Sequence, residues 1–219
     1  MIKKRQFLKL IAGAVFLLYS CENPPSDKQS DKDTSTTTST ASEVADGEKY
    51  KIDTTASSIK WKGKKTTGEH FGSVKIKEGY LLINKDSVVG GDVQIDMNTI
   101  VVEDIKDAET NAKLVGHLKD KDFFDVTNNP TATFTLSNIK NKDGKDMATG
   151  QLKIKGINKE ISFPVKVTVE GKKITAKGTA IIDRTLWDIK YGSGKFFDNL
   201  GDKTIKDEIE IEFDLTAKP

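Results

Sequence analysis

The side chains that could carry out chemistry in this chain are two histidines, one cysteine and a set of aspartates. The aspartates that follow His117 most closely are Asp120, Asp122 and Asp125. A histidine beside a carboxylate is the usual pairing of a general base with the acid that orients it, but such a site also needs a nucleophile. No serine stands in a nucleophile-elbow motif, and the two histidines are not in metal-ligand spacing. The sequence predicts no catalytic residue, metal or cofactor, and we expect His117 to cap or hydrogen-bond a helix end.

The single cysteine, Cys21, is placed for covalent lipid attachment. Three basic residues at positions 3–5 precede a short apolar run, and residues 18–21 read Leu-Tyr-Ser-Cys. This pattern resembles the lipobox of bacterial lipoproteins, although Tyr19 replaces the usual small residue. The resemblance implies that residues 1–20 are a signal peptide and that Cys21 is acylated, which would anchor the protein to a membrane of the bacterial cell envelope, periplasmic or outer. The alternative is an ordinary secretory signal with a chance cysteine.

The segment 21–48 is predicted to be a linker. Residues 22–48 hold five serines, five threonines and seven acids, and almost no apolar residue. Such a segment cannot bury enough apolar surface to offset the entropy lost on ordering. A disordered chain of this length has a root-mean-square reach of roughly 30 Å. We therefore expect a polar linker between Cys21 and a domain that spans 49–219.

The charge balance argues against a nucleic-acid partner. The formal net charge is only +2, because 35 basic residues are balanced by 33 acids. No stretch combines aromatic residues with arginines in the manner of a nucleic-acid-binding surface.

From Tyr50 onward, apolar residues alternate with polar ones, which is typical of β-strands with one buried face. Eight segments show the pattern: 58–63, 74–77, 93–97, 134–136, 152–155, 161–169, 174–182 and 209–215. Glycine-containing pairs or single glycines predict turns at Gly90–Gly91, Asp143–Gly144 and Gly171.

Only the segment 107–118 has convincing helical spacing, with Asp107 as its expected N-cap. One short helix cannot cover the apolar faces of eight strands, so those faces must pack against each other. Closure into a barrel achieves this without exposed sheet edges. We predict an all-β fold, an antiparallel eight-stranded barrel with one short helix between strands. A two-sheet sandwich is the main alternative.

The small residues at inward positions of 174–182 favour a cavity, since eight-stranded barrels can hold one small ligand. Alternatively, they relieve crowding against Trp61, Trp187 or Phe213. The candidate wall residues, each of which could equally be ordinary core, are Trp61, Val93, Ile95, Phe134, Phe163, Val165, Ala176, Gly178, Ala180 and Phe213.

Three motifs carry a resemblance to a known family. Residues 114–126 read Leu-Val-Gly-His-Leu-Lys-Asp-Lys-Asp-Phe-Phe-Asp-Val and are followed by Pro130 and Phe134. Residues 150–156 read Gly-Gln-Leu-Lys-Ile-Lys-Gly, and residues 161–165 read Ile-Ser-Phe-Pro-Val. Over nearly the whole domain the chain resembles the YceI-like family of secreted lipocalin-like barrels. The run 183–189 departs from the family pattern, because it lacks the glycine that usually follows its arginine and aromatic residue.

The resemblance implies a lipocalin-like barrel that binds a polyisoprenoid chain, and it allows a homodimer. From the residues themselves, we expect His117, Phe123 and Phe124 at one barrel end, with the phenylalanines packing the helix against that end as a lid or plug. We therefore expect a membrane-tethered, non-catalytic carrier for a long apolar lipid, of the polyisoprenoid or isoprenoid-quinone type. The alternative is an envelope structural or interaction module with a filled barrel and no lipid ligand.

Overall fold

The computed structural model describes residues 46–219. The predicted signal peptide, Cys21 and nearly all of the predicted linker lie outside the described residues, so the expectations for them stay predictions. The elements of the described part are β1 (Glu48–Ile52), β2 (Ser58–Lys65), β3 (Gly68–Asn84), β4 (Ser87–Val102), α1 (Ala108–Lys119), β5 (Thr131–Lys142), β6 (Lys145–Ile154), β7 (Ile157–Glu170), β8 (Lys173–Asp183), the 3₁₀ turns η1 (Arg184–Trp187) and η2 (Gly201–Lys203), and β9 (Ile205–Lys218).

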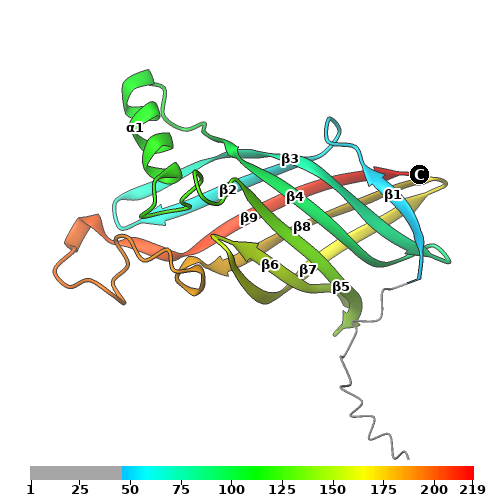
Figure 1. The fold of residues 1–219 in the computed structure, drawn as a ribbon. Coiled ribbons are helices and arrows are strands. Elements are labelled where there is room, and N and C mark those ends of the chain that lie inside the picture. Colours follow the sequence, from blue (N-terminus) through cyan, green and yellow to red (C-terminus); the bar gives the residue numbers. More distant parts are fainter. Residues whose placement is uncertain (1–45) are drawn as a thin grey trace, which may run out of the picture. The chain divides into compact units, whose positions relative to one another are not determined.

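Strands β2 to β9 form a closed antiparallel barrel (Figure 1). Hydrogen-bonded neighbours follow the order β3-β2-β9-β8-β7-β6-β5-β4, and pairing of β3 with β4 closes the ring. The eight-stranded barrel with a short helix between β4 and β5 is therefore confirmed, and the sandwich alternative is wrong. The sequence missed β1, a five-residue strand that pairs with β3 and β9. With only Tyr50 and Ile52 buried, it is too short for a clear alternation.

Apolar side chains meet on the inner face because the strand registers place inward-facing residues of neighbouring strands opposite each other. Between β2 and β9, Ile59 lies opposite Phe213 and Gly63 lies opposite Ile209. The acids that alternate along β9, such as Glu208 and Glu212, take the other face. This is the arrangement that period-two alternation requires, because each strand is buried on one face and exposed to solvent on the other.

Helix α1 begins where the sequence predicts. The Asp107 carboxylate accepts hydrogen bonds from the backbone N–H of Thr110 at 2.8 Å and from its hydroxyl at 2.6 Å. These two bonds lower the pKa of the Asp107 carboxyl. At the other end, the N–H of Asp120 donates to the carbonyls of Gly116 and His117 and ends the helix.

Two of the three predicted glycine turns are confirmed. Gly144 and Gly171 occupy the β5–β6 and β7–β8 turns with φ of +78° and +57°, a region that glycine enters without steric penalty. The turn predicted at Gly90–Gly91 is wrong, because both residues lie inside β4. A Cβ at Gly91 would come within 2.7 Å of the carbonyl oxygen of Tyr80, so this glycine permits close approach of β3 and β4.

A pair of glycines in adjacent strands allows a test of this close packing. In β3, a methyl group at Gly72 would overlap the backbone carbonyl of Val101, whereas at Gly63 in β2 nothing lies within 4 Å of the added atom. We expect Gly72→Ala to lower the free energy of unfolding by about 1–3 kcal/mol or more, and Gly63→Ala to change it by less than about 0.5 kcal/mol. Urea unfolding of both variants measures the difference. Equal losses would contradict this account of the β3–β4 contact.

Candidate functional site

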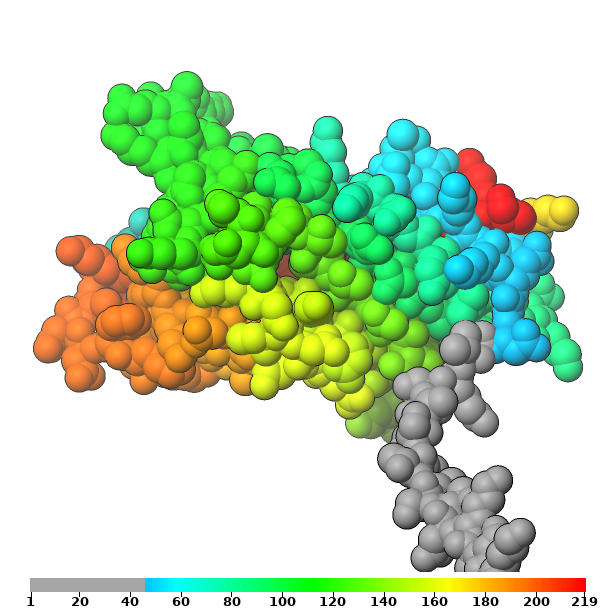
Figure 2. Space-filling model, viewed as in Figure 1, coloured from blue at the N-terminus to red at the C-terminus, as the bar shows by residue number. Residues whose placement is uncertain are grey.

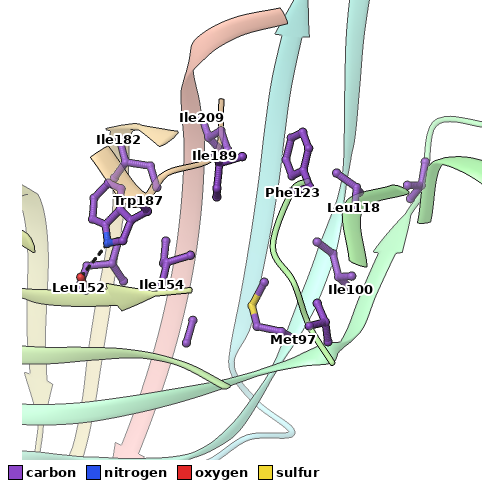
Figure 3. Close-up of a cluster of buried hydrophobic side chains, with 13 residues drawn as sticks. Met97, Ile100, Leu118, Phe123, Leu152, Ile154, Ile182, Trp187, Ile189 and Ile209 are labelled. Carbon is purple, nitrogen blue, oxygen red and sulfur yellow. Dashed lines mark hydrogen bonds between the residues drawn. The ribbon is translucent and has the colours of Figure 1, made fainter. Parts of the chain in front are cut away.

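One end of the barrel interior is closed by a buried apolar cluster, which we call the end plug (Figure 3). Its members are Met97, Ile100, Val102, Leu118, Phe123, Val126, Ala132, Leu152, Ile154, Ile182, Trp187, Ile189 and Ile209. Trp187 has no exposed surface, and its indole N–H donates to the carbonyl of Leu152 at 3.1 Å. Because its ring is surrounded and its only polar group is satisfied, Trp187 is a fixed part of the end plug.

The barrel encloses a cavity of about 110 Å³, here called the barrel cavity. Its lining residues are Ile59, Leu81, Val88, Gly91, Val93, Ile95, Phe134, Leu136, Ile139, Ala148, Leu152, Ile161, Phe163, Val165, Val167, Ala176, Ala180, Ile211, Phe213 and Leu215. None of these side chains carries a polar group. Such a surface can hold hydrocarbon but offers no group for orienting or activating a polar substrate.

Eight of the ten predicted wall residues line the barrel cavity: Val93, Ile95, Phe134, Phe163, Val165, Ala176, Ala180 and Phe213. Their role in ligand binding stays a prediction. Trp61 and Gly178 are not in the lining. Trp61 lies instead at the α1 end, where its indole N–H donates to the carbonyl of Val101 at 3.2 Å.

Three phenylalanine rings from different strands occupy the middle of the cavity wall. The ring of Phe163 lies 5.3 Å from that of Phe134 and 5.4 Å from that of Phe213, measured between centroids. Two glycines make room for them, since a Cβ at Gly150 or at Gly178 would approach the ring of Phe134 or Phe213, respectively, to 2.7 Å. At Gly178 the alternative explanation is therefore correct, because this residue relieves crowding against Phe213. Ala176 and Ala180 on the same strand do line the cavity.

Sequence alternation missed several lining residues because β-bulges shift the period. Leu136 and Ile139 both line the barrel cavity although they are three positions apart. The β5–β6 register shifts between Leu136 and Asn138, so the inward positions change parity there. Strand β3 has similar shifts against β4, for example between Ile76 and Glu78. Leu81, which follows that shift, is another lining residue that the sequence missed.

The residues predicted at the barrel end come together at the α1 end. Phe123 belongs to the end plug, and its ring contacts the ring of Phe124 at 5.2 Å. The His117 ring contacts Phe123 at 5.8 Å and Tyr191 at 4.4 Å, both edge-to-face. The expected capping role of His117 is wrong, since the Asp120 N–H ends the helix and the His117 ring packs against aromatic rings instead.

A buried arginine organises the segment that follows β8. Arg184 is 1% exposed and donates to the carbonyls of Ile189 at 2.7 Å, Lys206 at 3.1 Å and Ile205 at 3.2 Å. Its guanidinium also lies 3.7 Å from the Asp207 carboxylate. Burial lowers the pKa of Arg184 and the charge of Asp207 opposes that shift, so the ion pair offsets part of the cost of desolvation.

Lys195 links Asp207 to a second acid. Its ammonium lies 2.7 Å from the Asp183 carboxylate and 3.1 Å from that of Asp207. The hydrogen bonds to Asp183 and Asp207 raise the pKa of Lys195. At Asp183 burial acts to raise the pKa, but hydrogen bonds from Lys195 and Thr185 outweigh it and lower the pKa.

The residue that stands where the family pattern has glycine is Asp188, directly after Trp187. Asp188 adopts a φ of +59°, in the left-handed region. Aspartate enters this region more readily than most residues other than glycine. The loop thus keeps a glycine-like backbone conformation without the glycine.

Within residues 46–219, no group of three or more His, Cys, Asp or Glu side chains is placed so that it could hold a metal ion. Nor does this part contain a helix that is long and apolar enough to span a membrane.

Comparison with known proteins places this geometry in a family. The chain is 30% identical over 102 residues to Protein YceI of Shigella flexneri, which covers 46% of this chain and 50% of that protein. It is also 30% identical over 102 residues to the UPF0312 protein of Pseudomonas aeruginosa strain LESB58, with the same shares covered. The chain thus spans about half the length of the curated relatives it matches.

Solved structures match over a larger part of the chain. The crystal structure of Burkholderia cenocepacia BcnA has a TM-score of 0.62 and 26% identity, covering 76% of this chain and 99% of that one. A polyisoprenoid binding domain from Saccharophagus degradans has a TM-score of 0.55 and 15% identity, covering 77% of this chain and 97% of that one, which shows a shared fold. The model of the YceI-like domain matches residues 50–217, which include all of β2 to β8 and nearly all of β9. The chain therefore belongs to the YceI-like domain family.

Proposed function

We propose that this protein is a carrier that sequesters an apolar lipid, of the polyisoprenoid or isoprenoid-quinone type, in its barrel cavity. The observation that carries the proposal is the lining of that cavity, which contains only apolar residues. Burial of one five-carbon isoprene unit gives roughly 4 kcal/mol of transfer free energy at ~0.8 kcal/mol per carbon. A few units would suffice for tight binding after the costs of association. The structure from S. degradans that shares this fold is a polyisoprenoid binding domain, which supports the ligand class.

The size of the cavity sets a condition on how a long chain binds. At about 110 Å³ the barrel cavity is smaller than an engineered 150 Å³ cavity that accepts benzene. A chain of several isoprene units therefore requires side chains to move. Phe134 and Phe213 are the natural candidates, because both rings are only partly buried and line the cavity.

The proposal is tested by filling the cavity. Ala176→Phe places a ring in a space that can accept it, so we expect the variant to fold and to lose bound prenyl lipid. Lys177→Phe is the matched control, because it adds the same ring at a neighbouring exposed position. Native mass spectrometry and lipid extraction are applied to a chain that starts at residue 21 with Cys21→Ser, which retains every described residue. A clean apo mass for the parent chain, with no uptake of added prenyl alcohol, would overturn the proposal.

The membrane tether is part of the same proposal. Acylation of Cys21 would hold the barrel near a bilayer that supplies or receives the lipid, in a bacterial periplasmic or outer-membrane setting. Mass spectrometry of the N-terminal peptide of the native protein tests this, with a diacylglyceryl group on Cys21 as the expected result. An unmodified cysteine would contradict the anchor while leaving the lipid-carrier proposal intact. The predicted homodimer is tested separately, by light scattering.

One observation favours the second candidate, an interaction module. Leu186, Tyr191, Phe196 and Phe197 are each about half exposed, with exposed fractions of 51%, 45%, 48% and 50%. They belong to the segment between β8 and β9, which is orange in Figure 2 and lies at one end of the described barrel domain. Exposed aromatic side chains of this kind often mark contact surfaces. An empty barrel that takes up no lipid would favour this candidate.

A further inference from the structure

A second cavity of about 100 Å³ lies at the α1 end and is distinct from the barrel cavity. It is bounded by β2, β3, α1, the residues just after α1, and the start of β9. Its lining residues are Trp61, Gly63, Lys64, Lys65, His70, Leu114, His117, Leu118, Phe123, Phe124, Arg184, Ile205, Lys206 and Ile209. None of these residues lines the barrel cavity. The second cavity therefore has to be explained separately.

The walls of the second cavity are apolar and largely aromatic. Trp61, Phe123 and Phe124 contribute rings, and Leu114 and Ile209 add aliphatic surface. The Trp61 N–H and three of the five Arg184 N–H groups already donate to backbone carbonyls. Of the two histidines in the lining, His70 is hydrogen-bonded to Asp104, and the His117 ring packs against aromatic rings. The walls thus suit a hydrocarbon chain.

The charged residues that line the second cavity are all basic. Lys64, Lys65 and Lys206 are exposed, and within residues 46–219 none of them forms an ion pair. No aspartate or glutamate is among the lining residues. Lysines of this kind lay their methylene stems along apolar surface and keep the ammonium in water.

Two carboxylates that contact lining residues already have partners. Asp104 lies 2.7 Å from the His70 ring and also accepts the N–H of Phe71. Asp207 faces Arg184 and Lys195. Glu69 lies opposite Lys64 in the β2–β3 register without forming an ion pair with it. The three rim lysines therefore leave an excess of positive charge beside an apolar opening.

We propose that the second cavity binds a single-chain amphiphile with an anionic head group. The hydrocarbon chain lies against Trp61, Phe123 and Phe124, and the head group is held at the rim by Lys64, Lys65 and Lys206. As in the barrel cavity, a volume of about 100 Å³ requires side chains to move when a long chain enters. A carboxylate or a phosphate on an alkyl or prenyl chain supplies this chemistry. The site does not depend on the barrel cavity and goes beyond the proposed carrier function.

Binding is measured by isothermal titration calorimetry with dodecanoate, dodecyl phosphate and uncharged dodecanol, below their micelle-forming concentrations. The protein is the chain from residue 21 with Cys21→Ser. We expect Lys65→Glu combined with Lys206→Glu to weaken binding of both anions about tenfold, with little effect on dodecanol. Lys153→Glu combined with Lys166→Glu makes the same charge change on exposed strand positions outside both cavities, and should leave binding unchanged.

A second variant tests the chain-binding wall. Nothing lies within 4 Å of a Cβ added at Gly63, so Gly63→Leu should fold while its side chain fills the second cavity. We expect it to reduce the affinity for every probe with a twelve-carbon chain at this site at least tenfold. Comparison of the two anions then shows whether phosphate or carboxylate is preferred.

The outcomes separate this inference from the carrier proposal. If Gly63→Leu and the rim charge reversal leave binding of both anions unchanged, the second site is overturned. If Ala176→Phe abolishes that binding instead, the probes occupy the barrel cavity, and the carrier proposal stands while the second site fails. If Ala176→Phe loses bound prenyl lipid but still binds the anions, the result supports both the carrier proposal and the second site.

Discussion

Replacement of Trp187 by alanine should lower the free energy of unfolding by about 3–5 kcal/mol, the range for removal of a large buried aromatic side chain. Trp187 is fully buried in the end plug, so its loss leaves a large void. It also leaves the Leu152 carbonyl without the indole donor that lies 3.1 Å away. Urea or thermal unfolding measures the change.

Two matched variants separate the contributions to this loss. Trp187→Phe keeps most of the ring packing but removes the N–H, so we expect a smaller loss of about 1–3 kcal/mol from the unsatisfied Leu152 carbonyl and the residual void. Trp61→Ala removes the same side-chain type from a half-buried position and should cost less than Trp187→Ala. Equal losses for the two Trp→Ala variants would show that the end plug is not a principal source of stability.

The effect of Trp187→Ala should extend to the barrel cavity. Leu152 accepts the indole hydrogen bond and also lines that cavity. A void behind Leu152 lets the wall relax, so a bound lipid should dissociate faster from this variant than from the parent chain. Unchanged release of a prenyl lipid would show that the wall is held by the strand pairing alone.

Most of the fold could be predicted from the sequence because β-strands with one buried face have a simple period. Each of the eight alternating segments lies on one of the strands β2 to β9, except that Lys155 follows the end of β6. The N-cap at Asp107 could also be predicted, because a side-chain hydrogen bond to the third residue onward is a local interaction. The family motifs then indicated the barrel type.

The predictions that failed concern features that depend on contacts between segments distant in the sequence. Gly91 is needed inside β4 because the Tyr80 carbonyl approaches it closely. Gly178 is needed in β8 because the Phe213 ring packs against it. The inward position of Ile139 depends on the β5–β6 bulge. Trp61 has the correct strand parity, but it lies beyond the barrel cavity at the α1 end. Alternation specifies the face of a strand, but it does not specify the position along the barrel axis.

The same limitation applies to the second cavity. Its lining comes from β2, β3, α1 and β9, whose residues are separated by up to about 150 positions in the chain. Lys64 and Lys65 look like ordinary solvated residues in the sequence, and only the fold brings them beside Lys206 and the aromatic residues that follow α1. The sequence did single out Trp61 and the barrel-end residues His117, Phe123 and Phe124, but it did not indicate that they share a cavity.

Replacement of Arg184 by methionine should lower the free energy of unfolding by about 3 kcal/mol or more, the lower part of the range for breaking a buried ion pair. The guanidinium is 1% exposed and donates to three backbone carbonyls, all of which would lose a partner. Asp207 would also lose its neighbour, and its Oδ1 atom already lacks a hydrogen-bond donor. Lys195 still contacts the other oxygen of Asp207, which keeps the loss toward the lower end of the range.

Two further variants test this mechanism. Arg184→Lys should not restore stability, because an ammonium cannot reproduce the planar donor fork that reaches the carbonyls of Ile189, Ile205 and Lys206. In the double variant Arg184→Met with Asp207→Asn, the buried unpaired charge is removed, so the loss should be smaller than the sum of the two single losses. A double-mutant cycle by urea unfolding measures this coupling. Strict additivity would show that Asp207 does not stabilise Arg184 across their 3.7 Å separation, and that the carbonyls alone hold the guanidinium.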